Sequence, residues 1–259
     1  MMQMGIFRLL IFMAALLPWS LSAEEPTKPL PTLEEVTKKL DDLYRSESSK
    51  STVVMEIVNN RGKRTLTMDQ WTRGEDNALI IIRKPAREAG TATLKTDEGL
   101  WNYAPRADRL IRVPSGLLSD SWMGSHFTND DLVRESSYDD DFVGELSRVE
   151  EGGRKVLKVK LTPKKGTPVE FERLEYFLDE EAWVPIRADF YDKGKIYRKM
   201  EFRDVRDVDG KKVPFVMELS VMDKPGERTT ISYTELRLNI EVPESTFTQQ
   251  GLRRAAKQR

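Results

Sequence analysis

The sequence predicts a mainly β fold, in which one antiparallel sheet curls into a barrel or half-barrel and a helix packs against it. Apolar side chains alternate with polar ones from about residue 51 onward, as at Val53, Met55 and Ile57. Turn signals such as Asn59–Gly62 and Glu151–Gly153 separate these segments. The spacing predicts about eleven strands, which we place in a single domain over residues 32–250.

The first 23 residues are typical of a secretory signal peptide. Arg8 precedes the apolar run Leu9–Leu17, and Ser20–Ala23 supplies small residues for cleavage. That run is shorter than the roughly 20 residues that a membrane-spanning helix needs. The chain contains no cysteine, and lipid anchors of exported bacterial proteins and disulfides both require one. We therefore expect a periplasmic protein without a lipid anchor.

The residues available for catalysis or metal binding are few. His126 is the only histidine, so a zinc site of ordinary composition cannot form. Ser125 and His126 are neighbours whose side chains point apart in an extended segment, and no nucleophile elbow or nucleotide-binding motif is present. The acidic residues at 130–131 and 139–141 lack the spacing of a calcium loop. We expect no enzyme activity, metal or cofactor. The net charge of −1 argues against nucleic-acid binding.

A helix is expected after a flexible, proline-rich lead-in at residues 24–31. Thr32 and Glu35 form a capping box, in which each side chain satisfies a backbone amide of the first turn. The apolar residues that follow recur every three or four positions and predict a stripe that packs on the sheet: Leu33, Val36, Leu40 and Leu43. Further along, the segment Ala78–Arg83 is apolar on both faces. One face should meet the core and a helix should cover the other.

Residues 115–141 interrupt the strand pattern with a long, lid-like insertion. Trp122, Met123 and Phe127 lie in it without two-residue alternation, and Asn129 is placed to cap a short helix. Long connections within compact domains are commonly functional lids. Residues 251–259 form a basic tail, which we expect to be solvated. Contact of this tail with anionic lipid headgroups is the alternative.

The aromatic residues near the insertion indicate a site for an apolar ligand. Any one of them is ordinarily a core residue, but an amphipathic insertion over a methionine- and tryptophan-rich sheet favours a pocket for an alkyl chain. Each buried methylene contributes about 0.8 kcal/mol, so a chain of about 14–16 carbons would contribute roughly 10 kcal/mol before costs. Such binding requires no polar specificity.

Five segments occur in an order that resembles the outer membrane lipoprotein-sorting protein family of the LolA/LolB-like superfamily. They are Trp71–Gly74, Leu79–Ala86, Gly90–Leu94, Leu100–Pro105 and Met123–Leu132. The resemblance implies a strongly curved antiparallel half-barrel of about eleven strands, with helices over its concave face and acyl chains held between them. The family usually has Asp where this chain has His126, a side chain that can titrate near neutral pH.

The predicted function is that of a non-enzymatic carrier of lipoprotein acyl chains or other lipids, passed toward the outer membrane. An inner-membrane transporter and an outer-membrane acceptor are the partners that this role implies, and we expect the free chain to be a monomer. The alternative is a periplasmic sensor or an accessory subunit of a lipid-exporting transporter. A hydrolase of lipid-linked substrates is a third hypothesis, which would require carboxylates to converge in the cavity.

Ten residues are predicted to bind lipid, six as the lining and four as the floor of the cavity. The lining residues are Trp71, Trp101, Tyr103, Trp122, Met123 and Phe127, and the floor residues are Met55, Met68, Ile82 and Met217. Arg73 and Arg83 are predicted to hold the lid segment by hydrogen bonds.

Overall fold

The computed structural model describes residues 29–74, 76–133, 141–167 and 169–258. The predicted signal peptide, most of the lead-in and residues 134–140 of the insertion lie outside the described residues. Residues Pro31–Arg259 form one compact unit. No helix among the described residues is long and apolar enough to cross a membrane.

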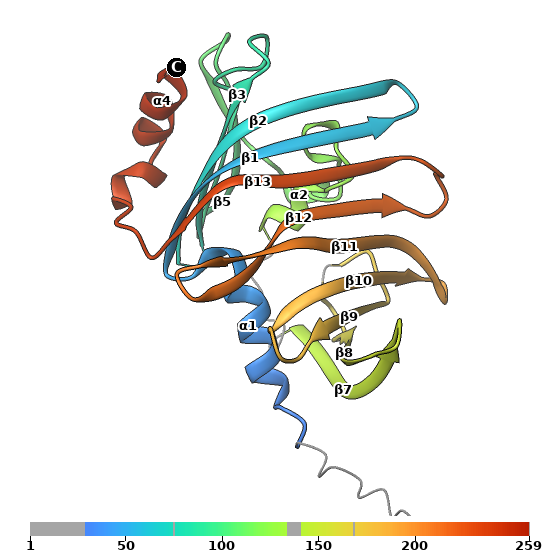
Figure 1. Cartoon of the computed structure of the whole chain (residues 1–259). Helices are drawn as coiled ribbons and strands as arrows, with labels where there is room; N and C mark the ends of the chain where they lie inside the picture. Colours follow the sequence, from blue (N-terminus) through green and yellow to red (C-terminus); the bar gives the residue numbers. More distant parts are fainter. Residues whose placement is uncertain (1–28, 75, 134–140, 168, 259) are drawn as a thin grey trace, which may run out of the picture. The chain divides into compact units, whose positions relative to one another are not determined.

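The unit is built on a single antiparallel sheet of thirteen strands, which is curved and remains open (Figure 1). The first six strands are β1 (Ser48–Asn59), β2 (Gly62–Arg73), β3 (Asn77–Lys84), β4 (Ala92–Thr96), β5 (Gly99–Ala104) and β6 (Arg109–Arg112). The other seven are β7 (Phe142–Glu151), β8 (Arg154–Pro163), β9 (Arg173–Asp179), β10 (Val184–Asp192), β11 (Lys195–Val208), β12 (Lys211–Val221) and β13 (Arg228–Leu238).

The strand count exceeds the predicted eleven because short strands carry too few residues to show alternation. β4 has five residues and β6 has four. The sheet order is β6-β5-β4-β3-β2-β1-β13-β12-β11-β10-β9-β8-β7. Every neighbouring pair is therefore consecutive in the chain except β1 and β13, which join the two halves of the sheet, from Ser49 opposite Leu238 to Val58 opposite Arg228.

Helix α1 (Leu33–Arg45) lies on the inner face of the sheet, the face that curves around it in Figure 1. Its predicted capping box is confirmed, since Thr32 and Glu35 bond reciprocally. The predicted stripe is confirmed too: Val36 and Leu43 are fully buried against the sheet. At the other end, the Tyr44 hydroxyl donates to the carbonyl of Pro214 over 2.9 Å and its ring stacks on Tyr233 at 5.1 Å.

The two apolar faces predicted for residues 78–83 are also confirmed. Ile80 and Ile82 belong to an inner-face cluster, whereas Leu79 and Ile81 pack on the outer face. The outer face is covered by the C-terminal segment, comprising η3 (Glu244–Phe247) and α4 (Gln249–Lys257). Helices thus lie on both faces, not on the concave face alone.

The residues predicted to be a solvated basic tail form most of α4. The Thr248 hydroxyl caps the helix by accepting from the Gly251 amide over 3.0 Å, and the side chain of Leu252 is fully buried. A solvated tail was predicted because this segment is rich in lysine and arginine. Leu252 and the two alanines at 255 and 256 instead provide a short apolar stripe that packs on the outer face.

Candidate functional site

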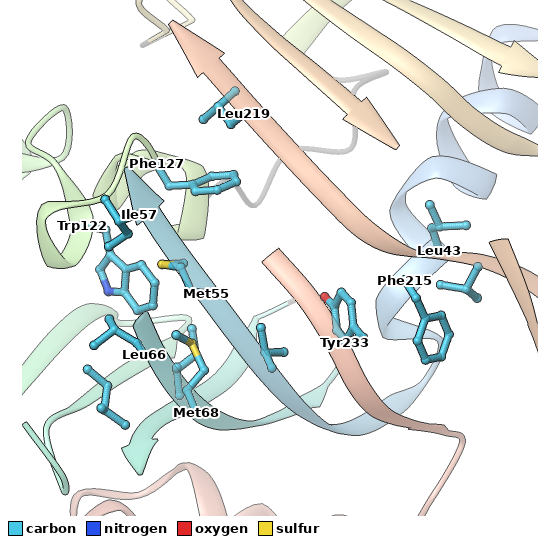
Figure 2. Close-up of a cluster of buried hydrophobic side chains, with 14 residues drawn as sticks. Leu43, Met55, Ile57, Leu66, Met68, Trp122, Phe127, Phe215, Leu219 and Tyr233 are labelled. Atoms are coloured by element: carbon cyan, nitrogen blue, oxygen red, sulfur yellow. The ribbon is translucent and has the colours of Figure 1, made fainter. Parts of the chain in front are cut away.

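The candidate site is a methionine- and aromatic-rich cluster on the inner face. Its buried members come from α1, from β1 to β3, from β12 and β13, and from the insertion; Figure 2 shows Trp122 and Phe127 of the insertion approaching Met55, Met68 and Leu219 of the sheet. Met123 and Met217 pack at its margin. Because strand side chains alternate between faces, the inner rows of several neighbouring strands together make this one apolar surface.

The insertion reaches the cluster through residues 121–128, which we call the Trp loop. The loop closes on itself: the Trp122 amide donates to the Phe127 carbonyl over 2.8 Å, and Ser121 and Thr128 form an isolated β-bridge. Inside the loop, the Ser125 amide and hydroxyl both donate to the Trp122 carbonyl, over 2.9 and 2.7 Å. These bonds satisfy the loop's own backbone, so its two large aromatic side chains can enter an apolar environment at little polar cost.

Trp122 is anchored to the sheet by its one polar atom. Its indole N–H donates to Thr93 Oγ1 of β4 over 3.1 Å, and the Thr93 hydroxyl donates in turn to the Asn102 side chain of β5 over 2.9 Å. The Trp122 side chain is almost completely buried. This bond fixes the depth and orientation of the ring, because a buried indole N–H without an acceptor is costly.

Arg64 of β2 holds the turn of the Trp loop. Its guanidinium donates to the Met123 carbonyl over 2.7 Å and pairs with Glu88 in the β3–β4 connection. Met123 has a φ of 53° and Gly124 a φ of 71°, so the chain reverses sharply where Arg64 meets it. A left-handed conformation is unfavourable for a methionine, and the charged hydrogen bond to its carbonyl helps to stabilise that turn.

Arg198 of β11 holds the far end of the loop. It donates to Asp131 over 2.9 Å. The same Asp131 oxygen accepts from the Thr128 amide over 2.8 Å, while the Asp131 amide donates to the Thr128 hydroxyl over 3.1 Å. This reciprocal pair starts the short helix α2 (Asn129–Val133). Thr128, not the predicted Asn129, is the capping residue. The Asn129 side chain instead donates to the Leu117 carbonyl over 3.0 Å.

His126 makes the fourth attachment. Its backbone amide donates to Thr229 Oγ1 of β13 over 3.0 Å, and its Nδ1 lies 2.8 Å from that oxygen. Its Nε2 lies 3.4 Å from a Glu227 carboxylate oxygen. The carboxylate can only accept, so Nε2 carries the proton in this contact. The loop therefore contacts strands from both halves of the sheet.

Seven of the ten predicted lipid-binding residues belong to the inner-face cluster: Met55, Met68, Ile82, Trp122, Met123, Phe127 and Met217. The other three, Trp71, Trp101 and Tyr103, lie on the outer face. Trp71 and Tyr103 pack in the cluster that α4 covers, and Trp101 pairs with Leu94 of that cluster and carries Arg112 at 5.8 Å from its ring. Grouping by sequence proximity placed them wrongly, because strand parity decides the face.

The two arginines predicted to hold the lid have other contacts among the described residues. Arg83 pairs with Asp69 and donates to the carbonyls of Ala255 and Gln258, over 3.0 and 2.6 Å, so it holds the C-terminal end of α4. Arg73 pairs with Glu244 at 3.7 Å, near the start of η3. Both therefore act on the outer face. Arg64 and Arg198 take the predicted role on the inner face.

Sequence reasoning missed Arg64 and Arg198, although a signal for each was present. Arg64 precedes Leu66 and Met68 at two-residue spacing, and Arg198 precedes Met200 and Phe202 in the same way. A cation within an apolar row points to the same face as that row. Such a position requires a buried acceptor, which the insertion supplies.

The chain is similar to a protein family in sequence and to several solved structures in fold. A family model described as an uncharacterized protein matches residues 74–254, and a search of curated proteins found no match. A DUF1329 family protein from Desulfovibrio piger has a TM-score of 0.75 at 23% identity, covering 85% of this chain and 97% of that chain.

Two further solved structures share the fold. A domain assigned to outer membrane lipoprotein sorting, from Vibrio parahaemolyticus, has a TM-score of 0.73 at 21% identity, covering 85% of this chain and 97% of that one. A LolA superfamily protein from Nitrosomonas europaea has a TM-score of 0.71 at 19% identity, covering 86% of this chain and 100% of that chain. The chain therefore belongs to the uncharacterized family that the matching model describes, and it shares the fold of the LolA superfamily protein, as its sequence motifs predict.

Proposed function

We propose that this protein is a periplasmic, non-enzymatic carrier that holds acyl chains of lipoproteins or other lipids on the inner face of its sheet, for transfer toward the outer membrane. The observation that carries the proposal is the Trp loop. Its two aromatic side chains fill an apolar cluster of the sheet, while a few polar contacts attach it to separate strands. A ligand that displaces the loop would meet a ready apolar surface.

The composition of the cluster suits alkyl chains. Met55 and Met68 are buried in it and Met217 packs at its edge. Methionine side chains are unbranched and adaptable, which lets a surface follow chains of different length. The remaining buried members of the cluster are aliphatic or aromatic, and their polar side-chain atoms are the Tyr233 hydroxyl and the Trp122 indole N–H. Such a surface selects for apolar length and not for a polar headgroup.

The free energy gained by burying the aromatic side chains of the Trp loop is similar to that gained by burying an acyl chain. Truncating a buried Trp or Phe to Ala costs about 3–5 kcal/mol, so Trp122 and Phe127 together contribute roughly 6–10 kcal/mol to closure. An acyl chain of about 16 carbons gains roughly 10 kcal/mol or more on burial, at about 0.8 kcal/mol per methylene. Exchange between loop and ligand is then nearly balanced, which a carrier requires for both loading and release.

The family resemblance supports the same role. A structure of the same fold comes from a domain assigned to outer membrane lipoprotein sorting. We extend that role to this chain, with an inner-membrane transporter as donor and an outer-membrane protein as acceptor, and with the free carrier as a monomer. Fold alone does not fix function, so the proposal depends on the behaviour of the Trp loop.

A reversible lock on the loop tests the proposal. The chain has no cysteine, so the double variant His126→Cys/Thr229→Cys would carry a single pair. The His126 backbone amide donates to Thr229 Oγ1 over 3.0 Å, so the two residues lie close at the backbone, as a disulfide requires. The oxidised variant should not bind a fluorescent fatty acid, and reduction should restore binding. Each single variant serves as its control.

The cargo is then identified from the native protein. Mass spectrometry of organic extracts from protein purified without detergent should find an acylated species at one or more equivalents. If the protein is empty, and the reduced double variant and the wild type both refuse added lipids, the carrier proposal fails. A partner-binding role, as in a sensor or a transporter accessory, would then replace it.

A further inference from the structure

Three segments that are distant in the sequence meet at one end of the sheet. They are residues 84–91, from the end of β3 to the start of β4; residues 104–109, which span the β5–β6 turn; and the last turn of α4. A Cβ added at Gly90 would lie 3.1 Å from the Ala256 carbonyl oxygen and 3.4 Å from Pro105. The Arg106 guanidinium donates to the Arg87 carbonyl over 3.1 Å. Figure 1 shows the C-terminal end of α4 beside these loops.

The surface of this junction is strongly cationic. Six exposed cations lie on the three segments: Lys84, Arg87, Arg106, Arg109, Arg254 and Lys257. The acidic residues of the same segments are Glu88 and Asp108. Glu88 is largely buried and pairs with Arg64 as well as Arg87, and Asp108 pairs with a seventh cation, Arg253, at 3.2 Å. The whole chain has a net charge of −1, so this positive excess is local.

The junction is held rigidly enough to present these charges together. Arg83 bonds two carbonyls at the end of α4, over 3.0 and 2.6 Å. Asp108 accepts from both the Tyr103 hydroxyl, over 2.9 Å, and Arg253 of α4. The pKa of Asp108 is lowered by these two hydrogen bonds and by the charges of Arg253 and Lys257, which shows that the β5–β6 turn and the last turn of α4 share one electrostatic environment.

The exposed residues between these cations are small. Ala86, Ala89, Ala104 and Ala107 are exposed on these segments, and the exposed large hydrophobic residue next to them in the sequence is Ile111 of β6. A cationic surface with alanine between its charges can approach a layer of phosphates closely. Its attraction is therefore electrostatic and sensitive to salt.

We propose that this basic junction, formed by residues 84–91, 104–109 and 253–257, docks the protein on the anionic phospholipid surface of a membrane. The partner is a lipid surface because the charges come from three separate segments and spread over an area, as the charges of a layer of anionic headgroups do. The junction adjoins the Trp loop through Glu88, which pairs with Arg64, but none of its exposed cations belongs to the inner-face cluster. The proposal stands whether or not the inner-face cluster binds an acyl chain.

The test is sedimentation of the purified protein with vesicles. The wild type should sediment with vesicles of equal parts phosphatidylglycerol and phosphatidylcholine at low salt. It should not sediment with pure phosphatidylcholine vesicles, and high salt should release it. The triple variant Lys84→Glu/Arg109→Glu/Arg254→Glu should bind at least about tenfold more weakly, because each cation at an anionic surface changes partitioning by about fivefold.

A charge-matched control separates this surface from a general effect of net charge. Lys193→Glu/Lys195→Glu/Lys224→Glu reverses three exposed cations in the β10–β11 and β12–β13 turns, and it should bind vesicles as the wild type does. Thermal unfolding and binding of a fluorescent fatty acid by both triple variants serve as tests of folding. Equal loss of vesicle binding in the two variants would overturn the proposal. Failure of the wild type to sediment with anionic vesicles would also overturn the proposal, even if the junction then bound an acidic protein.

Discussion

The indole N–H of Trp122 donates to Thr93 Oγ1 over 3.1 Å, and this bond joins the insertion to the inner face of the sheet. It links a loop residue to a strand residue that no sequence pattern pairs with it. Around it, Phe127 and the methionines of the sheet complete the apolar cluster. The relationship makes Trp122 the residue on which closure of the Trp loop depends most.

Trp122→Ala should therefore lower the free energy of unfolding by about 3–5 kcal/mol, the usual cost of removing a buried tryptophan side chain. Trp101→Ala is the matched control, because Trp101 is only partly buried on the outer face beside Arg112. Its cost should stay below about 2 kcal/mol. Urea unfolding of both variants measures the difference, and equal losses would show that the Trp loop is not part of the core.

Arg64→Lys should loosen the Trp loop. Lysine has no guanidinium fork and cannot hold both the Met123 carbonyl and Glu88 in the observed geometry. A hydrogen bond to a charged donor contributes about 1.5–3 kcal/mol. Hydrogen exchange at the Trp122 and Ser125 amides should thus become at least about tenfold faster. Arg73→Lys, which changes an ion pair on the outer face, should leave exchange at these two amides unchanged.

Gly251→Ala should detach α4 from the outer face. A Cβ at this position would lie 2.1 Å from the Ser245 carbonyl oxygen and 2.7 Å from that of Thr246, and backbone atoms cannot move aside easily. We expect a loss of about 1–3 kcal/mol in unfolding free energy and faster tryptic cleavage after Arg254. Gln250→Ala, an exposed neighbour, is the control. Unchanged cleavage in Gly251→Ala would mean that the turn before α4 adapts.

Tyr44 should contribute to alkaline unfolding. Burial, and secondly the charge of Tyr233, raises the pKa of Tyr44 well above its ordinary value of 10.0. A group whose pKa is raised by folding stabilises the protein below the unfolded pKa, and this stability is lost as pH rises from there toward the folded pKa. Between pH 9 and 11 the wild type should lose about 1.4 kcal/mol more than Tyr44→Phe.

Urea unfolding at the two pH values gives this difference directly. At pH 9 the variant should be less stable by about 1 kcal/mol, because it lacks the hydrogen bond to the Pro214 carbonyl. The gap should close toward pH 11. A gap that stays constant would show that Tyr44 does not titrate differently in the folded and unfolded chain.

Local and periodic features of the fold were predictable from the sequence. The capping box of Thr32 and Glu35 depends on four consecutive residues, and the two apolar faces of Ala78–Arg83 follow from alternation. The face on which Trp71 lies was not recovered, although it follows from its register opposite Leu79. The aromatic residues were grouped because of their size and their proximity in the sequence. The face to which a strand side chain points depends instead on whether it is an odd or even number of residues from a neighbour of known face.

The partners of the insertion could not be predicted, because they depend on tertiary contacts. Arg64 is 59 residues from Met123, and His126 is 103 residues from Thr229. The composition of the insertion indicates that it covers something apolar, but not which strands hold it. For the same reason α4 was interpreted as a tail: its short apolar stripe is meaningful only beside the outer face that receives it.

The pairing of β1 with β13 has a consequence for how the chain folds. Strands β1 to β6 and β7 to β13 can each form from neighbouring hairpins, but the seam joins Ser49 to Leu238 and can close only after both exist. Such high contact order slows folding, because the entropy of closing a very long loop must be overcome first. The Trp loop uses Thr93 from one half and Thr229 from the other. The closed form of the Trp loop therefore requires strands from both halves of the sheet, and a chain in which only one half has folded leaves part of the apolar cluster uncovered.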